Sequence, residues 1–492
     1  MNLPTIENRN FWFFIIPISL IYIILTLLST NHCYFWDNIQ QISKEAHWFY
    51  LTDFKSMLMP APNSGSEIVA TGYHPPLMGI MTAALWKAFG YKLWVSHVFV
   101  LFWFGILLYN CWKLIFRFFD PSIAGWILAI ALLESTLLSQ FIIASPDFIL
   151  FTSFVLSLRS ILERKYVLLA IGIFFLCAIN MRGIFAGATL FISQLYFENI
   201  QSKEKIKIRD YIRMTIPYLP TLVILSVYFV FYFLTRGWFF ANSSTEGHYA
   251  LPNSFFRIAK HFSEFGLRSV ENGRIIIWLA GIIFGYFMWK NKLKLSDEKK
   301  FLLAVFVLLT GLYTLFIFIT QMPFSARYFM PQFFILTILA TSGMATFLKK
   351  QTLKYAFILI IFFEITGNFW IYPDKIAKSW DCTLAHLPYY KLRNQCFKYI
   401  DEKNISYNDL SAGFCLYGNR NFIELSENSK TVNSDTNRKY FIYSNISNLE
   451  DNFAEELNDK SKWMPIKRFE EGFVKIIVYE RIFVSTFPKH EK

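Results

Sequence analysis

The stretch FWFFIIPISLIYIILTLL, residues 11–28, followed closely by Asp37 and Asn38, decides the fold class of this chain. An apolar run of this length forms a helix long enough to cross a hydrocarbon core of about 30 Å. Asp37 is then expected at the membrane surface on the far side. Ionisable residues in such places usually face a water-filled cavity or a substrate. Asp37 is therefore a candidate functional residue, and the alternative is a solvated loop acid that follows an aromatic belt of Tyr34, Phe35 and Trp36.

The composition indicates a membrane protein. Of the 492 residues, 54% are hydrophobic and only 17% are charged, which is untypical of a soluble protein. The formal net charge is +13, but no basic block resembles a nucleic-acid-binding arm, so we expect no nucleic-acid partner. The placement of the Lys and Arg residues in the loops explains most of this charge.

Hydropathy predicts about eleven membrane spans, several of them short enough to be tilted or re-entrant. The first span is expected to remain as an anchor, because its apolar core is too long for a signal peptide and no small-x-small cleavage site follows. The predicted spans are about 11–30, 94–116, 121–138, 146–161, 166–180, 183–197, 213–235, 273–289, 301–320, 328–347 and 353–371.

The distribution of Lys and Arg predicts the orientation. One set of segments between spans carries nineteen of these residues and the short alternate loops carry two, so the first set is cytoplasmic. The N-terminus is then cytoplasmic in a multi-pass cytoplasmic (inner) membrane protein. A first outer loop at 31–93, a polar loop at 236–272 and the tail after Ile371 are extracytoplasmic. The loop at 236–272 could close over a substrate, with a plain solvated loop as the alternative.

The segment from Pro75 to Phe89 is apolar but too short to span. Pro suits the first turn of a helix, and fifteen residues extend only about 22 Å. A crossing here would also reverse every later basic loop, against the charge rule. We therefore predict a re-entrant or surface helix, with a second amphipathic segment at 43–54 in the interface.

The predicted topology brings several polar residues to the face that carries Asp37. A group of acids, a histidine and arginines at one membrane level is suited to an anionic group beside a proton acceptor. Each member also has a simpler explanation: a helix cap for Asp147, snorkelling to headgroups for the arginines, and a satisfied interface residue for the histidine. The group comprises His74, Glu134, Asp147, Arg182 and Arg327.

Four motifs carry a family resemblance over roughly residues 10–345. They are Tyr73-His74-Pro75-Pro76-Leu77, Ser145-Pro146-Asp147, Asn180-Met181-Arg182-Gly183 and Arg327-Tyr328-x-x-Pro331. With them the chain resembles the GT-C membrane glycosyltransferases, in the branch of the protein O-mannosyltransferases and the lipid A aminoarabinose transferase. The resemblance implies a catalytic Asp in the first outer loop, here Asp37, and a polyprenyl-phosphate sugar as donor. Protein mannosyltransferases usually have an Asp-Glu pair, whereas Asn38 follows Asp37 here, so a glycolipid, lipopolysaccharide or polysaccharide acceptor is favoured over a protein.

The chemistry of such a transfer assigns a role to each candidate. Asp37 is the expected base, with inversion at the anomeric carbon, and Arg327 and Arg182 are expected to bind the donor phosphate. Asp147, His74 and Glu134 are candidates for acceptor or metal binding. The sequence leaves a divalent metal ion open, since it contains no compact ligand motif. No Gly-rich nucleotide-binding loop occurs, which is consistent with a lipid-linked donor.

Two other functions share some of these features. A lipid-linked sugar transporter would place ionisable residues at mid-membrane depth and would show repeated halves, whereas here the charges lie at the outer ends of spans. A polysaccharide polymerase would carry its large loop late in the chain. The predicted first domain is 1–372, which contains the large first outer loop.

Residues 373–492 have a more polar composition and predict a small extracytoplasmic α+β domain. Strand-like runs occur at 414–417, 440–443 and 474–479, and a helical stretch occurs near 449–457. Of the cysteines predicted outside the membrane, Cys382 and Cys396 are the pair to test first for a disulfide, although sequence alone cannot fix connectivity.

Overall fold

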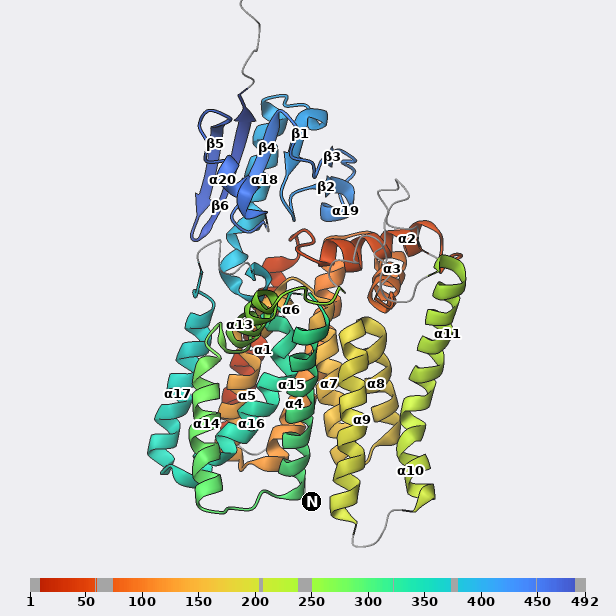
Figure 1. The fold of residues 1–492 in the computed structure, drawn as a ribbon, viewed down its shortest axis with the longest axis vertical. Helices are drawn as coiled ribbons and strands as arrows, with labels where there is room; N and C mark the ends of the chain where they lie inside the picture. The colour runs from red at the N-terminus through yellow and green to blue at the C-terminus, as the bar shows by residue number, and fades with distance from the viewer. Residues whose placement is uncertain are drawn as a thin grey trace, which may run out of the picture.

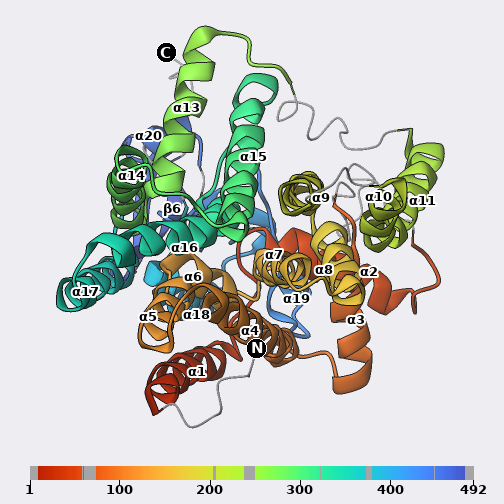
Figure 2. The ribbon, with the colours of Figure 1, turned by 90° about the horizontal axis from the view of Figure 1, so that it is seen from below.

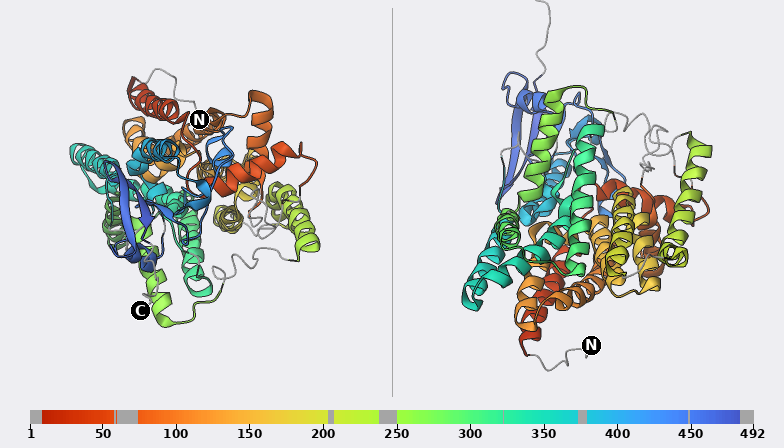
Figure 3. Two further views of the ribbon diagram at one scale, coloured as in Figure 1. Left: turned by 90° about the horizontal axis from the view of Figure 1, so that it is seen from above. Right: turned by 60° about the horizontal axis from the view of Figure 1, so that its bottom comes forward.

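A bundle of helices with a small α+β domain at one end makes up the protein (Figure 1). The structure, a computed structural model, describes residues 9–57, 59, 74–202, 207–237, 250–321, 323–372, 379–447 and 449–482. Helix α1 (Arg9–Ser29) begins at the end of the bundle opposite to the α+β domain (Figures 1 and 3). The predicted fold class, a polytopic α-helical protein with a C-terminal α+β domain, is confirmed.

The bundle is built from apolar helices joined mostly by short turns. Its helices are α4 (Leu93–Phe118), α5 (Pro121–Leu132), α6 (Ser135–Ile142), α7 (Pro146–Leu162), α8 (Tyr166–Ile179), α9 (Met181–Gln201), α10 (Ile208–Thr215), η2 (Ile216–Tyr218), α11 (Leu219–Arg236), α13 (Phe255–Val270), α14 (Ile275–Lys290), α15 (Asp297–Ile319), η3 (Ala326–Phe329), α16 (Met330–Phe347) and α17 (Lys350–Gly367).

Five stretches of the described chain are long and apolar enough to cross a membrane: α1, α4, α10–α11, α15 and η3–α16. Two bent pairs bring this number to seven if each counts as one span. Helices α5 and α6 meet at 56°, and α13 and α14 meet at 91°. The predicted count of about eleven spans stays a prediction, since α7 and α8 are shorter than a full crossing.

Helix α7 lies at the centre of the bundle (Figure 2). Every one of its residues is buried, because α4, α6, α8, α9 and α16 surround it. The sequence of α7 is largely apolar, with Asp147 and Arg159 as its charged residues, and such a helix suits the interior of a bundle. Asp147 occupies the first turn of this helix, so its backbone belongs to a fully buried element.

The first outer loop packs under the α+β domain. It contains a π-helix, η1 (Ile39–Lys44), followed by α2 (Glu45–Leu51) and α3 (Leu77–Phe89). Helix α3 begins directly after Pro75-Pro76 and, at 13 residues, is not long enough to be a span candidate, as predicted. Helix α2 lies in the segment predicted to be interfacial, but His47 and Phe49 are buried.

The C-terminal region contains a four-stranded sheet of order β1-β4-β6-β5, in which only the pairing of β1 with β4 is parallel. Helix α18 (Pro388–Glu402) packs on β5 and β6. The prediction for 414–417 is wrong because these residues form a turn, whereas the other predicted elements are present. The strands and remaining elements are β1 (Leu410–Ala412), β2 (Gly418–Asn419), α19 (Arg420–Glu424), β3 (Thr431–Val432), β4 (Tyr440–Ser444), α20 (Asp451–Glu456), β5 (Trp463–Glu471) and β6 (Val474–Arg481).

The cysteines are all free thiols in buried positions. The disulfide considered between Cys382 and Cys396 is therefore not formed. The Cys382 sulfur instead lies 3.3 Å from the Ser325 hydroxyl and 3.6 Å from a carboxylate oxygen of Asp381.

Candidate active site

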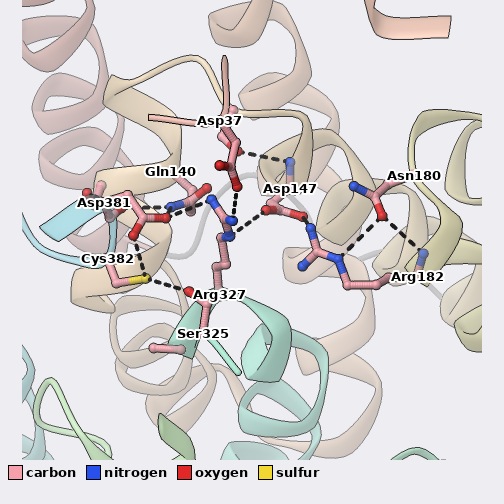
Figure 4. Close-up of polar contacts among 12 residues, drawn as sticks. Asp37, Gln140, Asp147, Asn180, Arg182, Ser325, Arg327, Asp381 and Cys382 are labelled. Carbon is pink, nitrogen blue, oxygen red and sulfur yellow. Dashed lines mark hydrogen bonds and ion pairs between the residues drawn. The ribbon is translucent and has the colours of Figure 1, made fainter. Parts of the chain in front are cut away.

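Arg327 is the centre of a charged cluster that joins four distant parts of the chain (Figure 4). Its guanidinium group contacts three carboxylates. The Nη1 atom donates to Asp381 Oδ2 at 2.8 Å, the Nε atom lies 3.2 Å from Asp147 Oδ2, and the Nη2 atom donates to Asp37. Only 7% of the Arg327 side chain is exposed. A planar guanidinium has five N–H donors in a fixed arrangement and can therefore hold several carboxylates in fixed geometry.

Asp37 is the most accessible acid of the cluster. Its side chain is 34% exposed, compared with 4% for Asp147 and 2% for Asp381. Its backbone carbonyl accepts hydrogen bonds from Gln40 and Gln41 at the start of the π-helix. Asp37 is therefore a carboxylate that an incoming molecule can reach.

The backbone just before Asp37 is held in a costly conformation. Trp36 has a φ of 56°, and left-handed backbone costs a residue other than glycine about 1–2 kcal/mol. The next residue, Asn38, donates from its side-chain amide to the Ile143 carbonyl at 2.6 Å. This bond ties the Asp37 loop to the turn before α7, where Ala144 also has a positive φ of 55°. Strained residues persist where surrounding structure fixes them, and both of these flank site carboxylates.

Asp147 bridges the two arginines of the cluster. Its Oδ1 atom accepts from Arg182 Nη2 at 2.7 Å, while its Oδ2 atom faces Arg327. Arg182 is also held by the Asn180 side chain, which caps α9, and its guanidinium lies 3.8 Å from the ring centre of Tyr328. Ser145, and not Asp147, caps α7. Asp147 thus fixes the relative positions of Arg182 and Arg327.

Asp381 is a member of the cluster that the sequence did not indicate. It lies in η4 (Trp380–Cys382), between the bundle and the C-terminal domain. Gln140 donates to its backbone carbonyl at 2.7 Å and lies 3.3 Å from Oδ2. Burial raises the pKa of the Asp381 carboxyl, Arg327 opposes this, and the nearby acids add to it. No motif surrounds Asp381, so only the folded chain shows its role.

His74 lies close to the same charges. Burial lowers its pKa to about 4, and Arg182, Asp147, Asp37 and Arg327 are near enough to influence its titration. Its ring is therefore neutral at pH 7. Tyr73, the first residue of the motif that contains His74, lies outside the described residues.

Glu134 is placed outside this cluster, in a structural role. Its carboxylate caps α6 by accepting from the backbone N–H groups of Thr136 and Leu137, at 3.0 and 2.7 Å. It also pairs with the fully buried Arg274 at 3.0 Å. Arg274 in turn donates to the Ala326 carbonyl at 2.6 Å, next to Arg327. This placement favours a supporting role for Glu134 over the acceptor or metal role predicted from the sequence.

The charged cluster does not have the arrangement of a metal site. Within the described ranges, no group of three or more His, Cys, Asp or Glu side chains is arranged to hold a metal ion. The carboxylates that meet here face arginines, whose positive charges take the place that a cation would occupy. The residues present therefore do not fit the divalent ion that the sequence left open.

A cavity of about 1100 Å³ begins at this cluster. Asp37, Arg327 and Asp381 line its buried end, and Lys260 of α13 together with Asp435 of the C-terminal domain lines its exposed end. The cavity is therefore enclosed by the bundle on one side and by the C-terminal domain on the other. Figure 3 shows that this domain lies over the end of the bundle.

The C-terminal domain is fixed to the first outer loop by polar contacts. The Tyr34 N–H donates to the Ile423 carbonyl at 2.8 Å. The Tyr91 hydroxyl donates to Asn421 Oδ1 at 2.7 Å and contacts the His47 ring. Burial lowers the pKa of His47 to about 4, so this ring is neutral at pH 7. These bonds hold the wall of the cavity next to the loop that carries Asp37.

Comparison with known proteins gives a structural likeness only. No protein-family model and no curated protein matches the chain by sequence. The crystal structure of ArnT from Cupriavidus metallidurans in the apo state is similar, with a TM-score of 0.50 and 11% identity over 94% of this chain and 97% of that chain. The chain has the GT-C fold. ArnT is the lipid A aminoarabinose transferase, so the resemblance stated from the motifs is confirmed at the level of the fold.

A second crystal structure of ArnT, bound to undecaprenyl phosphate, gives a TM-score of 0.48 at 11% identity over 95% of this chain and 98% of that chain. The likeness to ArnT extends over the bundle and the C-terminal domain, because nearly the whole of both chains is covered. At 11% identity this likeness shows the fold and assigns no residue of the site.

Proposed function

We propose that this protein is a glycosyltransferase that moves a sugar from a polyprenyl-phosphate donor to a hydroxyl group of an extracytoplasmic glycan or glycolipid. The observation that carries this proposal is the placement of Asp37. It is a partly exposed carboxylate at the buried end of a large cavity, held by an arginine that two further carboxylates fix. The GT-C fold supports a sugar transfer of this kind.

Asp37 accepts the proton of the acceptor hydroxyl. As that proton moves to the Asp37 carboxylate, the acceptor oxygen forms a bond to the anomeric carbon of the donor sugar. The bond between this carbon and the donor phosphate oxygen breaks, and the electron pair leaves with the polyprenyl phosphate. Attack from the face opposite to the phosphate inverts the anomeric configuration. General base catalysis of this kind contributes about 10²–10⁴-fold to a rate.

Arg327 orients the base. Its contacts with Asp381 and Asp147 prevent the guanidinium from rotating, so its Nη2 atom remains directed at Asp37. Preorganised charge of this kind needs no rearrangement during the reaction. A leaving phosphate needs little protonation, so one base together with cations suffices, in contrast to glycoside hydrolysis with its two carboxylates.

Arg182 is the residue that we propose as the main phosphate partner. It has one carboxylate contact, to Asp147, whereas Arg327 has three. Its stacking on Tyr328 holds the guanidinium plane in place and leaves N–H groups for a phosphate oxygen. The neutral His74 nearby adds a hydrogen-bonding group without repelling or attracting the phosphate. The donor phosphate would therefore lie on the Arg182 side of Asp37.

The proposed donor belongs to the same lipid class as the undecaprenyl phosphate of ArnT. We place the site on the extracytoplasmic face of the inner membrane, as the distribution of Lys and Arg predicts. No nucleotide sugar is present on that side, so a sugar must arrive on a lipid.

The proposal is tested by comparing the envelope glycans of the host cell with and without the gene. Mass spectrometry should show one glycan species that loses a single glycosyl residue when the gene is deleted. The wild-type gene and an Asp53→Asn variant should restore that residue, whereas Asp37→Asn should not. Asp53 is a matched control because it is an exposed acid of the same loop, paired with Lys87. An unchanged glycan profile, or full restoration by Asp37→Asn, would overturn the proposal.

A further inference from the structure

The cavity above Asp37 has two walls of different origin. One wall is formed by α13 and the segment 323–328 of the bundle, and the other by residues 412–417, 434–437 and 449–453 of the C-terminal domain. Helix α13 lies nearly perpendicular to α14, at 91°, and its Lys260, Glu264 and Arg268 line the cavity. Pockets that bind small ligands have volumes of about 300–1,000 Å³, so a cavity of about 1100 Å³ accommodates several sugar units.

The charge of this cavity is predominantly negative. Three bases line it, and each is already paired: Lys260 with Glu264 at 3.9 Å, Arg268 with Glu271 at 3.0 Å, and Arg327 with the site carboxylates. Six acids line it, namely Asp37, Glu264, Asp381, Asp435, Glu450 and Asp451. Asp37, Asp381 and Glu264 are the partners of Arg327 and Lys260, and Asp435 is paired with Arg438 at 2.9 Å. The excess of acids over bases therefore comes from the exposed C-terminal wall, where Glu450 and Asp451 lie. A cleft with an excess of one sign of charge concentrates ligands of the opposite sign and repels those of the same sign.

Neutral polar groups and aromatic rings occupy the rest of the C-terminal wall. Ser434, Thr436 and Asn437 offer hydrogen-bonding groups, and Phe414 and Tyr417 offer ring faces. Aromatic faces carry a negative quadrupole and attract the positively polarised C–H groups of a sugar ring, and they attract ammonium groups more strongly. Carboxylates accept hydrogen bonds from sugar hydroxyls. An anionic sugar would find only paired cations here.

We infer that the acceptor is a glycan free of phosphate, sulfate and carboxylate groups, with amino-bearing sugars preferred, and that the C-terminal domain selects it. This inference rests on the proposed function, since it names the substrate class of the same site. The glycan enters between α13 and the C-terminal domain. Its reacting hydroxyl reaches the 34% exposed Asp37 at the buried end, while its remaining sugars contact the acidic wall.

Binding of three oligosaccharides of equal length tests the inference. The probes are chitotriose, with three amino groups, its neutral N-acetylated form, and a 6-O-sulfated form of the latter. Calorimetry is performed on the full-length protein in phosphatidylcholine nanodiscs at low salt, so that lipid charge does not contribute. Chitotriose should bind at least about tenfold more tightly than the sulfated probe, with the neutral probe between them, as expected for several charges acting over about 7–10 Å of water.

Two sets of variants connect the preference to the cavity wall. The first set, Asp435→Asn, Glu450→Gln and Asp451→Asn combined, should reduce the ratio between chitotriose and the sulfated probe to less than about threefold. The second set, Glu402→Gln, Asp409→Asn and Glu427→Gln combined, removes the same charge from exposed positions of the domain that do not line the cavity, and should leave the ratio unchanged.

Three results would overturn the inference: no binding of any probe, equal or tighter binding of the sulfated probe, or a ratio that survives in the first set of variants. Binding is measured without donor, so the result does not depend on sugar transfer. Selective binding without any glycosyl transfer in cells would refute the proposed function and leave only the glycan preference of the cavity. Glycosyl transfer without selective binding would support the proposed function and overturn the inference.

Discussion

Replacement of Arg327 by Gln is the perturbation whose effect the contacts of the site define best. The substitution leaves the carboxylates of Asp37, Asp147 and Asp381 without their shared cation. Removing one partner of a buried ion pair typically costs about 3–5 kcal/mol, because the other charge remains buried and uncompensated. The cost is not shared equally. Asp147 keeps Arg182 and Asp37 is partly exposed, so most of it falls on Asp381.

A second substitution should therefore recover stability. Asp381→Asn removes the charge that lost its partner and keeps an amide near Gln140. In the Arg327→Gln background it should restore about 1–3 kcal/mol, the range seen for groups in one network. Thermal unfolding of the purified protein, followed by loss of the monodisperse peak, should show a decrease in Tm for Arg327→Gln and partial recovery in the double variant. Sugar transfer should stay absent in both, because Asp37 has lost its orienting group.

The stability of the Arg327→Gln variant should depend on pH through the carboxyl group of Asp381. The pKa of Asp381 is raised by burial even in the presence of Arg327, and removal of the cation raises it further. The folded variant then binds more protons than the unfolded chain, so its stability decreases as the pH rises from about 4 towards neutrality. This decrease should disappear in the double variant. Equal Tm values for wild type and Arg327→Gln at pH 7, or no recovery with Asp381→Asn, would refute the account of the cluster.

Three further predictions concern residues around the site. Arg182→Ala should raise the KM for the lipid donor by about tenfold or more, because a charge-assisted hydrogen bond contributes about 1.5–3 kcal/mol. The KM for the acceptor should stay nearly unchanged. An unchanged donor KM in a transfer assay would contradict a phosphate contact. Glu134→Gln should lower the Tm, because the buried Arg274 loses its carboxylate partner. The KM values of the folded enzyme should remain those of the wild type. A selective change in the acceptor KM would instead support an acceptor role. His47 has a pKa of about 4 in the folded protein against an ordinary value of 6.5, so the unfolded chain binds more protons and stability decreases as the pH falls from about 6.5 to 4. His47→Gln should flatten this decrease in a series of Tm measurements. An unaltered slope would rule out His47 as its cause.

The sequence predicts four charged residues of the site, because the order of the spans alone places them at the same face of the membrane. Asp37 follows the first span, and Asp147, Arg182 and Arg327 each begin a helix on the same face, so counting spans and charges was enough to group them. Their contacts could not be predicted. Which carboxylate meets which nitrogen depends on side-chain packing at the end of the buried helix α7.

The sequence does not indicate Asp381, because its role depends on a later part of the chain folding back onto the end of the bundle. Asp381 lies 54 residues beyond Arg327, in a region of mixed composition, and the bonds from Gln140 that fix it come from a different helix. Glu134 was grouped with the site because it lies at the outer end of a predicted span. The Ser135-Thr136 sequence that follows it, and the break between α5 and α6, were the available signs of a helix cap.

A polar loop is predicted from the sequence at 236–272, of which residues 238–249 lie outside the described residues and residues 255–270 form the helix α13. Phe255, Ile258, Phe262 and Phe265 recur at helical spacing, which would have predicted an amphipathic helix. With that helix recognised, the placement of Lys260 on the opposite face would have followed. Its position beside the C-terminal domain would not, since the sequence contains no measure of how the domain sits on the bundle.

In the proposed mechanism, Asp37 takes the proton of the acceptor hydroxyl. The most direct measurement is single-turnover release of polyprenyl phosphate from the donor, with the acceptor identified from envelope glycans, by wild-type protein, Asp37→Asn and Asp53→Asn in nanodiscs. Asp37→Asn should reduce the rate by at least about 10²-fold while donor binding and Tm stay close to the wild type, and Asp53→Asn should have no effect. Turnover by Asp37→Asn at the wild-type rate would contradict this mechanism.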